Sequence, residues 1–203
     1  MIKLVCGVGI NDADYVVCIK ETISSINGKQ KRKLLWVCPF YRAWTSMVNR
    51  CYNPKVQDKY STYKGCYVCD DWHLFSNFKG WMEQQDWEGK QLDKDILLTC
   101  NKMYGPDTCV FVSGTVNSFV TDHTAERGEW PIGVYWKRQN QKFVAQCKNP
   151  FTRKLEYLGC FFDPDEAHDA WLTRKREFAE MLAAEQDDAR VAKALVDRYE
   201  NYV

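Results

Sequence analysis

GVYWKRQNQKFVAQC (residues 133–147) and EYLGCFFDPDEAHDAW (residues 156–171) decide the fold of the C-terminal part of this sequence. They contain three short runs of aromatic and β-branched residues separated by polar turns, a pattern typical of strands. After the third run, Asp163 can cap a helix, Pro164 suits its first position and Glu166 completes a capping box. The pattern predicts a three-stranded antiparallel sheet packed on one helix, with strands at 132–137, 143–148 and 156–161.

Four local motifs within about 129–184 occur together. They are a Gly-Val opening, a Lys-Phe-Val-Ala second strand, a Leu-Gly-x-Phe third strand and a Glu-Ala-x-x-Ala helix start. Their combination resembles the DNA-binding domain of the APETALA/ethylene-response-factor type. The resemblance implies that the sheet enters the major groove of DNA while the helix braces the back of the sheet. A strand pair fits that wide groove and points alternate side chains at bases and phosphates.

The contact positions of that family, carried over to this sequence, imply a set of DNA-binding side chains. Arginine and lysine suit phosphate or guanine, and Gln146 suits adenine. Tyr135 and Leu155 replace two arginines that are usual in the family, so its target sequence is not carried over. The residues alone also allow a small domain with a solvated basic face. The implied contacts are Tyr135, Lys137, Arg138, Gln146, Lys148, Arg153 and Tyr157.

The charges are unevenly distributed along the chain, although the net charge is only +1. Residues 29–64 carry nine basic residues and one acidic residue, and residues 127–162 carry seven and two. Two basic blocks in a neutral protein indicate two surfaces for a polyanion, although solvated faces also produce such runs. Residues 113–130, rich in Thr, Ser, Gly and Glu, are the predicted linker.

The remaining segments show weaker periodicity. Residues 1–33 alternate loosely around Asn11-Asp12 and are predicted to form an N-terminal hairpin of unknown role, with a polar loop or strand end at 28–33. Apolar residues at three-and-four spacing predict helices over 40–51 and 74–82. The same spacing predicts a final C-terminal helix within 186–203.

The cysteine content points to metal binding. The apolar start is too short for a secretory signal, and no run approaches the ~18 apolar residues of a membrane span. We therefore expect a soluble, intracellular chain without a membrane partner. Ten cysteines in a reducing compartment need an explanation other than disulfides, and metal ligation is the leading one.

Three cysteine-containing stretches carry a second resemblance. They are CPFYRAWTSMVNRCYNP (38–54), YKGCYVCDDWHLFSNF (63–78) and LDKDILLTCNKMYGPDTCVFV (92–112). In order and spacing they resemble phage-encoded proteins labelled HNH endonucleases or homing-type DNA-binding proteins. The resemblance implies a small cysteine-rich module over 34–120.

The second resemblance also implies a zinc site. Cys38 stands where the pattern of those phage proteins has histidine, and zinc accepts either ligand. The implied ligands of one structural zinc are Cys38, Cys51, Cys69 and Cys109. Two alternatives stay open, namely buried unligated thiols or a second set made of Cys66, Cys69, Cys100 and Cys109.

A nuclease of the HNH type needs a histidine base beside the catalytic metal to activate water. The corresponding segment reads Leu92-Asp93-Lys94-Asp95, and Lys94 is a poor base at neutral pH. Asp93, Asp95 and Asn101 are still able to hold magnesium, and turn caps are an equal alternative for them. His73 is a candidate for a displaced base or a zinc ligand, although a surface role suits it better.

These observations predict a two-part α+β protein, with a zinc-stabilised module at 34–120, a DNA-binding domain at 129–185 and a C-terminal helix at 186–203. The predicted function is binding of double-stranded DNA in a phage or mobile-element setting, in the cytoplasm of a bacterial host, by an HNH-like scaffold that has lost catalysis. One alternative is an active homing-type endonuclease that uses magnesium. Another is an interaction protein that inhibits a host factor.

Overall fold

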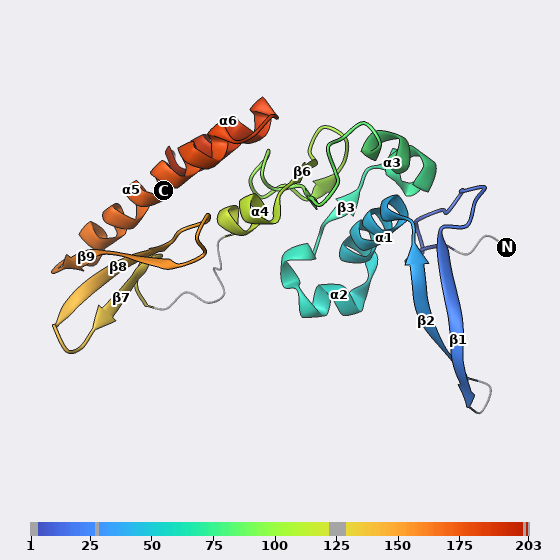
Figure 1. Ribbon diagram of the computed structural model, residues 1–203, viewed down its shortest axis with the longest axis horizontal. Coiled ribbons are helices and arrows are strands. Elements are labelled where there is room, and N and C mark those ends of the chain that lie inside the picture. The colour runs from blue at the N-terminus through green and yellow to red at the C-terminus, as the bar shows by residue number, and fades with distance from the viewer. Residues whose placement is uncertain (1–3, 27–28, 122–128, 201, 203) are drawn as a thin grey trace. The chain divides into compact units, whose positions relative to one another are not determined.

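Two compact units, residues 1–111 and 112–203, make up the computed structural model of this chain (Figure 1). The structure describes residues 4–26, 29–121, 129–200 and 202. Both units combine helices with small sheets, so the predicted α+β class is confirmed. Among the described helices, none has the length and apolar character needed to cross a membrane.

The helices of the first unit follow the apolar spacing of the sequence. Helix α1 spans Pro39–Tyr52 and helix α3 spans Phe75–Met82, which confirms both predicted helices. Between them, α2 spans Pro54–Lys59, and the Asn53 side chain caps it by accepting a hydrogen bond from the Lys55 amide. The buried face of α1 comprises Trp44, Met47, Val48 and Cys51.

Short strands and turns complete this unit. The parallel pair β3–β5 and the pair β4–β6 each join segments that are distant in sequence. The bounds of these elements are Tyr67–Val68 for β3, Gln91–Asp93 for β4, Met103–Tyr104 for β5 and Val110–Val112 for β6, with 3-10 turns at Ser61–Tyr63 (η1) and Asp70–His73 (η2).

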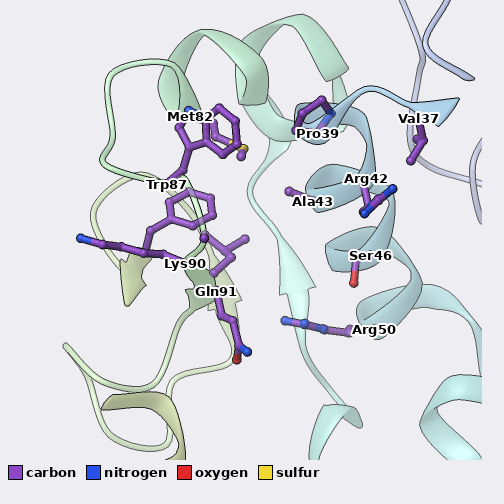
Figure 2. Close-up of a pocket in the computed structure, with 13 residues that line it drawn as sticks. Val37, Pro39, Arg42, Ala43, Ser46, Arg50, Met82, Trp87, Lys90 and Gln91 are labelled. Atoms are coloured by element: carbon purple, nitrogen blue, oxygen red, sulfur yellow. The ribbon is translucent and has the colours of Figure 1, made fainter. Parts of the chain in front are cut away.

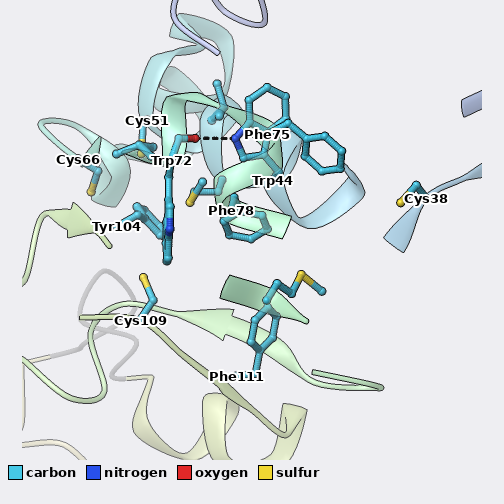
Figure 3. Close-up of a cluster of buried hydrophobic side chains, with 14 of the residues drawn as sticks. Cys38, Trp44, Cys51, Cys66, Trp72, Phe75, Phe78, Tyr104, Cys109 and Phe111 are labelled. Carbon is cyan, nitrogen blue, oxygen red and sulfur yellow. Dashed lines mark hydrogen bonds between the residues drawn. The ribbon is translucent and has the colours of Figure 1, made fainter. Parts of the chain in front are cut away.

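The core of the first unit is rich in aromatic side chains (Figure 3). The Trp44 ring is fully buried, and its Nε1 donates to the carbonyl oxygen of Trp72 at 2.7 Å. Trp44 also lies 5.5 Å from the Phe75 ring between centroids. Since a buried indole N–H needs a partner, this bond fixes α1 against the η2 turn.

The N-terminal hairpin differs from the prediction. Its strands are β1 (Cys18–Ile26) and β2 (Lys29–Val37), which pair antiparallel. The predicted turn at Asn11-Asp12 is wrong, because the Asp12 carboxylate accepts a hydrogen bond from the Ser76 amide at the start of α3. Residues 29–33, predicted as a loop or strand end, lie within β2. Both faces of the hairpin are exposed, which explains why apolar and polar residues alternate only weakly along it.

The second unit contains the predicted sheet and helix. Three antiparallel strands lie in the order β7-β8-β9, and α5 packs against them, which confirms the predicted arrangement. The Asp163 carboxylate caps α5 by accepting from the amides of Asp165 at 2.7 Å and Glu166 at 3.3 Å. The bounds are Val134–Lys137 for β7, Lys142–Lys148 for β8, Leu155–Phe161 for β9, Pro164–Ala184 for α5 and Ala189–Glu200 for α6.

Part of the predicted linker is a helix. Helix α4 spans Gly114–Val120, with Ser113 accepting a hydrogen bond from the Val116 amide as its cap. The carbonyl oxygen of Phe119 accepts from the Tyr199 hydroxyl at 3.0 Å, so α4 is tied to α6 within this unit. The sequence did not predict this short helix, because residues 113–130 are mostly polar. Its few apolar residues nevertheless fall at three-and-four spacing. Residues 122–128 lie outside the described part of the chain.

Candidate nucleic-acid interface

The sheet of the second unit has one face turned toward α5. Phe143 and Ala145 of β8 are buried there together with Ala167 of α5. The Cys147 side chain, two residues farther along β8, is also buried. Since side chains alternate between the faces of a strand, the intervening residues of β8 point to the opposite face.

That opposite face carries most of the predicted DNA contacts. Directly paired residues of antiparallel strands share a face, and the register pairs Tyr135 with Val144 and Gln146 with Tyr157. Tyr135 is 40% exposed and Tyr157 is 67% exposed. The structure therefore brings five predicted contacts to one face, which we call the outer face of the sheet: Tyr135, Lys137, Gln146, Lys148 and Tyr157.

A β-bulge sets which side chains of β9 reach the outer face. The register shifts between Ala145 and Gln146, so that Gly159 pairs with Ala145 whereas Tyr157 pairs with Gln146. Without this shift Leu158 would lie opposite Gln146, and Tyr157 would point toward α5. The bulge thus places Tyr157 opposite Gln146, and the Tyr157 hydroxyl donates to Cys160 Sγ at 3.1 Å.

The bulge also keeps a carboxylate away from the outer face. Glu156 pairs with Cys147 on the helix side, where its Oε2 accepts from Arg174 Nε at 2.8 Å and its Oε1 accepts from Asn149 Nδ2 at 2.6 Å. The bond from Arg174, together with the weaker effect of Asn149, holds the pKa of Glu156 below its usual value. The negative charge is therefore neutralised behind the sheet.

Two further predicted contacts lie in the turns. Arg138 follows β7 and is exposed, and Arg153 lies in the turn between β8 and β9 with a positive φ of 60°. The Asn149 Oδ1 orders the latter turn by accepting from the amides of Phe151 at 2.8 Å and Thr152 at 2.9 Å. These bonds fix the backbone of the turn that carries Arg153, whose side chain is exposed.

Lys148 and Arg153 meet at a cavity of about 330 Å³, which the hydroxyl-bearing residues Thr115 and Ser118 of α4 also line. Its lining contains no Asp or Glu. Among the described residues, neither Lys148 nor Arg153 forms an ion pair with a carboxylate. Two uncompensated cations beside hydroxyl groups suit an anion such as a backbone phosphate.

The nuclease candidates of the first unit form a tight turn. Lys94 is only 5% exposed, and its Nζ donates to Asp95 Oδ1 and to the Asn101 carbonyl oxygen, each at 2.5 Å. Asp93 Oδ1 accepts from the amides of Asp95 and Ile96, each at 2.7 Å. Asn101 Nδ2 donates to the Lys94 carbonyl oxygen at 2.9 Å. All of the predicted metal-holding side chains here thus make bonds within the turn.

His73 lies at the end of the η2 turn. Its Nε2 is 3.4 Å from the Tyr52 hydroxyl, and its Nδ1 is 4.0 Å from Asp70 Oδ1. The Tyr52 hydroxyl in turn accepts a hydrogen bond from the Val68 amide at 3.0 Å. These contacts give His73 local partners on α1 and in its own turn.

The predicted zinc ligands are not gathered together in the described structure. Figure 3 shows Cys38 apart from Cys51, Cys66 and Cys109, and the Cys38 sulfur lies 3.9 Å from the Tyr15 hydroxyl. Within the described ranges, no group of three or more His, Cys, Asp or Glu side chains could hold a metal ion. In this arrangement the four predicted sulfurs do not share one coordination shell.

Burial governs the chemistry of the inner cysteines. It raises the pKa of both Cys51 and Cys109 to about 12, and the neighbouring Cys66 adds to the effect on Cys51. Cys69 is half-buried, with a pKa that burial also raises, and Cys100 is exposed. At neutral pH Cys51 and Cys109 are therefore protonated in this arrangement, and a metal would have to displace their protons.

Sequence reasoning missed several residues that shape these surfaces. The sequence marks a turn at Asn149-Pro150, but it does not show that the Asn149 side chain organises the turn that carries Arg153. Arg174 neutralises Glu156 from α5, which only the three-dimensional pairing reveals. In the first unit, the Arg50 guanidinium bonds to the Tyr104 hydroxyl, and no local spacing connects those residues.

Comparison with known proteins gives one partial similarity. The chain is 41% identical over 56 residues to the ethylene-responsive transcription factor ERF117 of Arabidopsis thaliana. The match covers 28% of this chain and 16% of that protein, so the chain spans a minor part of its length. No family model matches the sequence, and no solved structure matches it.

Proposed function

We propose that this protein binds double-stranded DNA through the outer face of the β7-β8-β9 sheet. The observation that carries the proposal is that the exposed Tyr135 and Tyr157 and the half-buried Gln146 share one face with the lysines of β7 and β8, around the buried Val144. The similarity to a transcription factor supports it. The matched length is also close to that of the segment holding the sheet and α5.

The chemistry of the outer face suits a duplex. Tyrosine hydroxyls and the Gln146 amide are able to bond base edges, and a glutamine pairs in bidentate fashion with adenine. The phosphates on one side of the groove would be contacted by Lys148 and Arg153, and those on the other side by Arg138. The Glu156 carboxylate lies on the helix side of the sheet, where it is paired with Arg174, so its negative charge does not face the DNA.

A second surface for the backbone lies in the first unit. Strand β2 carries Lys31, Arg32 and Lys33 in succession, and all three are exposed. Such a run makes sequence-independent, salt-sensitive contacts with phosphates. We propose that this hairpin adds affinity for DNA without adding sequence preference.

Binding of a randomised duplex library, followed by selection and sequencing, tests the proposal. Replacing Gln146 with Ala should change the preferred sequence at one position, because an adenine contact worth about 1–3 kcal/mol is lost. The salt dependence of binding should stay nearly unchanged, because no phosphate contact is removed. Gln139→Ala in the β7–β8 turn is the matched control and should keep the original preference. Identical preferences in all three proteins would refute base reading by Gln146.

We further propose that the first unit has little or no nuclease activity. A lysine ammonium has no lone pair to accept a proton, and a general base typically increases the rate by a factor of ~10²–10⁴. Incubation with supercoiled plasmid and magnesium or manganese should therefore leave the plasmid intact. Metal-dependent nicking that disappears in Asp93→Asn or Asp95→Asn would instead establish the active endonuclease.

A structural zinc in the first unit stays a prediction. To hold it, the four predicted sulfurs would have to come together, with Cys38 moving toward the others. Elemental analysis of protein purified without chelator would then find about one zinc per chain, and chelator would lower the thermal stability, because a closed thiolate shell contributes directly to folding. Cys38→Ser should lose the metal if the predicted set is right, whereas Cys100→Ser should retain it. Zinc-free protein with chelator-insensitive stability would favour buried thiols instead.

A further inference from the structure

The first unit contains a cavity of about 440 Å³ that none of the preceding roles uses. It lies between α1 and residues 82–92, and Figure 2 shows Met82 and Trp87 across from Ala43 and Ser46. The volume falls in the range of small-molecule sites. The two sides of the cavity differ in chemistry.

One side of the cavity is apolar and partly aromatic. Met82, Trp87, Leu92 and Phe111 line it. The Trp87 ring is braced edge-on by Phe40, with 5.1 Å between the ring centroids and 62° between the planes. A held indole ring next to a polarisable methionine forms a wall against which a flat ring can stack.

The other side is cationic. Arg42, Ser46 and Arg50 follow one another at four-residue intervals along α1, which places them on one face of the helix. The cavity lining contains no Asp or Glu, and its third cation, Lys90, pairs with Asp86. Within the described part of the chain, no carboxylate forms an ion pair with either arginine.

Arg50 is a pre-oriented donor at the end of this side. Its guanidinium lies 5.6 Å from the centroid of the Tyr63 ring, and the Tyr104 hydroxyl is hydrogen-bonded to it. Burial alone would lower the pKa of Arg50, yet Tyr104 and Tyr63 raise it above its usual value. In Figure 2 the side chain extends across the opening toward Gln91. The tyrosine contacts orient the group, and the Asp93 carboxylate also helps to raise its pKa without forming an ion pair with it.

We propose that this cavity binds a nucleotide, with its phosphate at Arg42, Ser46 and Arg50 and its base against Trp87 and Met82. A simple anion would leave the apolar wall unused, and an apolar molecule would leave both arginines without an ion-pair partner among the described residues. A nucleotide joins an anion to a flat ring, and stacking on an aromatic side chain accepts any base. The proposal concerns the first unit and does not rest on duplex binding by the sheet.

The same chemistry is available from two sources, a free mononucleotide and a nucleotide within a single DNA strand. Calorimetric titration of the full chain with the four deoxynucleoside monophosphates, and with a single strand of about ten nucleotides, distinguishes them. Tighter binding of the strand assigns the site to single-stranded DNA. Equal or tighter binding of a monophosphate assigns it to a free nucleotide.

Fragments of the ligand test the two sides of the cavity. Deoxyadenosine and inorganic phosphate should each bind at least about tenfold more weakly than the monophosphate, because each lacks one partner. Arg42→Gln, at an exposed position, should weaken binding of the monophosphate about tenfold, and Trp87→Leu by about tenfold or more. Lys55→Gln removes an exposed cation of the same basic block outside the cavity and should leave binding unchanged.

Three results would overturn the proposal. The first is that neither the monophosphates nor the single DNA strand binds at concentrations up to about 1 mM. The second is that inorganic phosphate binds as tightly as the monophosphates. The third is that Arg42→Gln and Lys55→Gln lose the same amount of affinity for the monophosphate. If Trp87→Leu fails to fold, Arg42→Gln still decides the matter. Duplex binding is measured separately with the Gln146→Ala protein, so its failure and the failure of this proposal are distinguishable.

Discussion

Reversing the charge at both Arg138 and Lys148, by substitution with Glu, should lower the affinity for duplex DNA about 100-fold or more. Each side chain is exposed at an edge of the outer face, and among the described residues neither is paired with a carboxylate. A hydrogen bond to a charged group is worth about 1.5–3 kcal/mol, and tenfold in affinity corresponds to about 1.4 kcal/mol. The loss should be similar for all sequences, because phosphates carry no base information.

The salt dependence identifies the cause of this loss. Each lost phosphate contact lowers the slope of log K against log salt by roughly one, so the double variant should lose about two. Fluorescence anisotropy of a labelled duplex at several salt concentrations measures both quantities. Lys193→Glu on α6 is the control, since it breaks only an exposed pair with Asp197, which is worth at most about 1 kcal/mol.

The outcome also separates the candidate functions. If the double variant and a triple reversal of Lys31, Arg32 and Lys33 both bind duplex DNA as tightly as the original protein, DNA binding by these surfaces is wrong. The interaction protein that inhibits a host factor would then be the better account. If only one of the two variants loses affinity for duplex DNA, the unit that carries its substitutions is the one that supplies the affinity.

Replacing Gly133 with Ala should destabilise the second unit by about 2–4 kcal/mol. Gly133 precedes β7 with a φ of +82°, and a Cβ there would lie 2.1 Å from Cδ1 of Trp171. Trp171 is buried and stacks on His168, with 5.2 Å between ring centroids. The indole therefore has little room to move away from an added methyl group.

Urea unfolding followed by circular dichroism measures this effect. Gly80→Ala is the matched control, because Gly80 lies in α3, has open space around its Cα and has no positive φ. That change should be neutral or stabilising by up to about 1 kcal/mol. Equal stability of Gly133→Ala and the original protein would show that Trp171 moves freely, contrary to its packing in the structure.

The helices and the C-terminal sheet were predictable because their signals are local. The spacing of Trp44, Met47 and Cys51 defines α1, and Asp163-Pro164 defines the start of α5. The hairpin was misplaced because β1 and β2 are exposed on both faces, so burial imposes no alternation on them. Helix α4 escaped detection because it is short and lies in a polar segment.

The candidate interface was predictable as a set of residues but not as a surface. Alternation along β8 is enough to place Gln146 and Lys148 on one face. The face of Tyr157 depends on a bulge between β8 and β9. Gly159, inside β9 and with a positive φ, is a local signal for a bulge, but it does not specify the register of the two strands. Similarly, the separation of Cys38 from Cys51 is a property of tertiary structure that sequence spacing does not contain.

The isolated hairpin β1–β2 has a consequence for solubility. Each strand leaves one edge unpaired, and Ile19, Leu35 and Trp36 are all more than 40% exposed. Unpaired apolar edges promote strand-to-strand aggregation, and clustered lysine or arginine opposes it. The basic run at 31–33 is therefore expected to oppose self-association of the hairpin. Substitutions that neutralise this run are expected to produce oligomers, and sedimentation of each variant separates that effect from a change in DNA affinity.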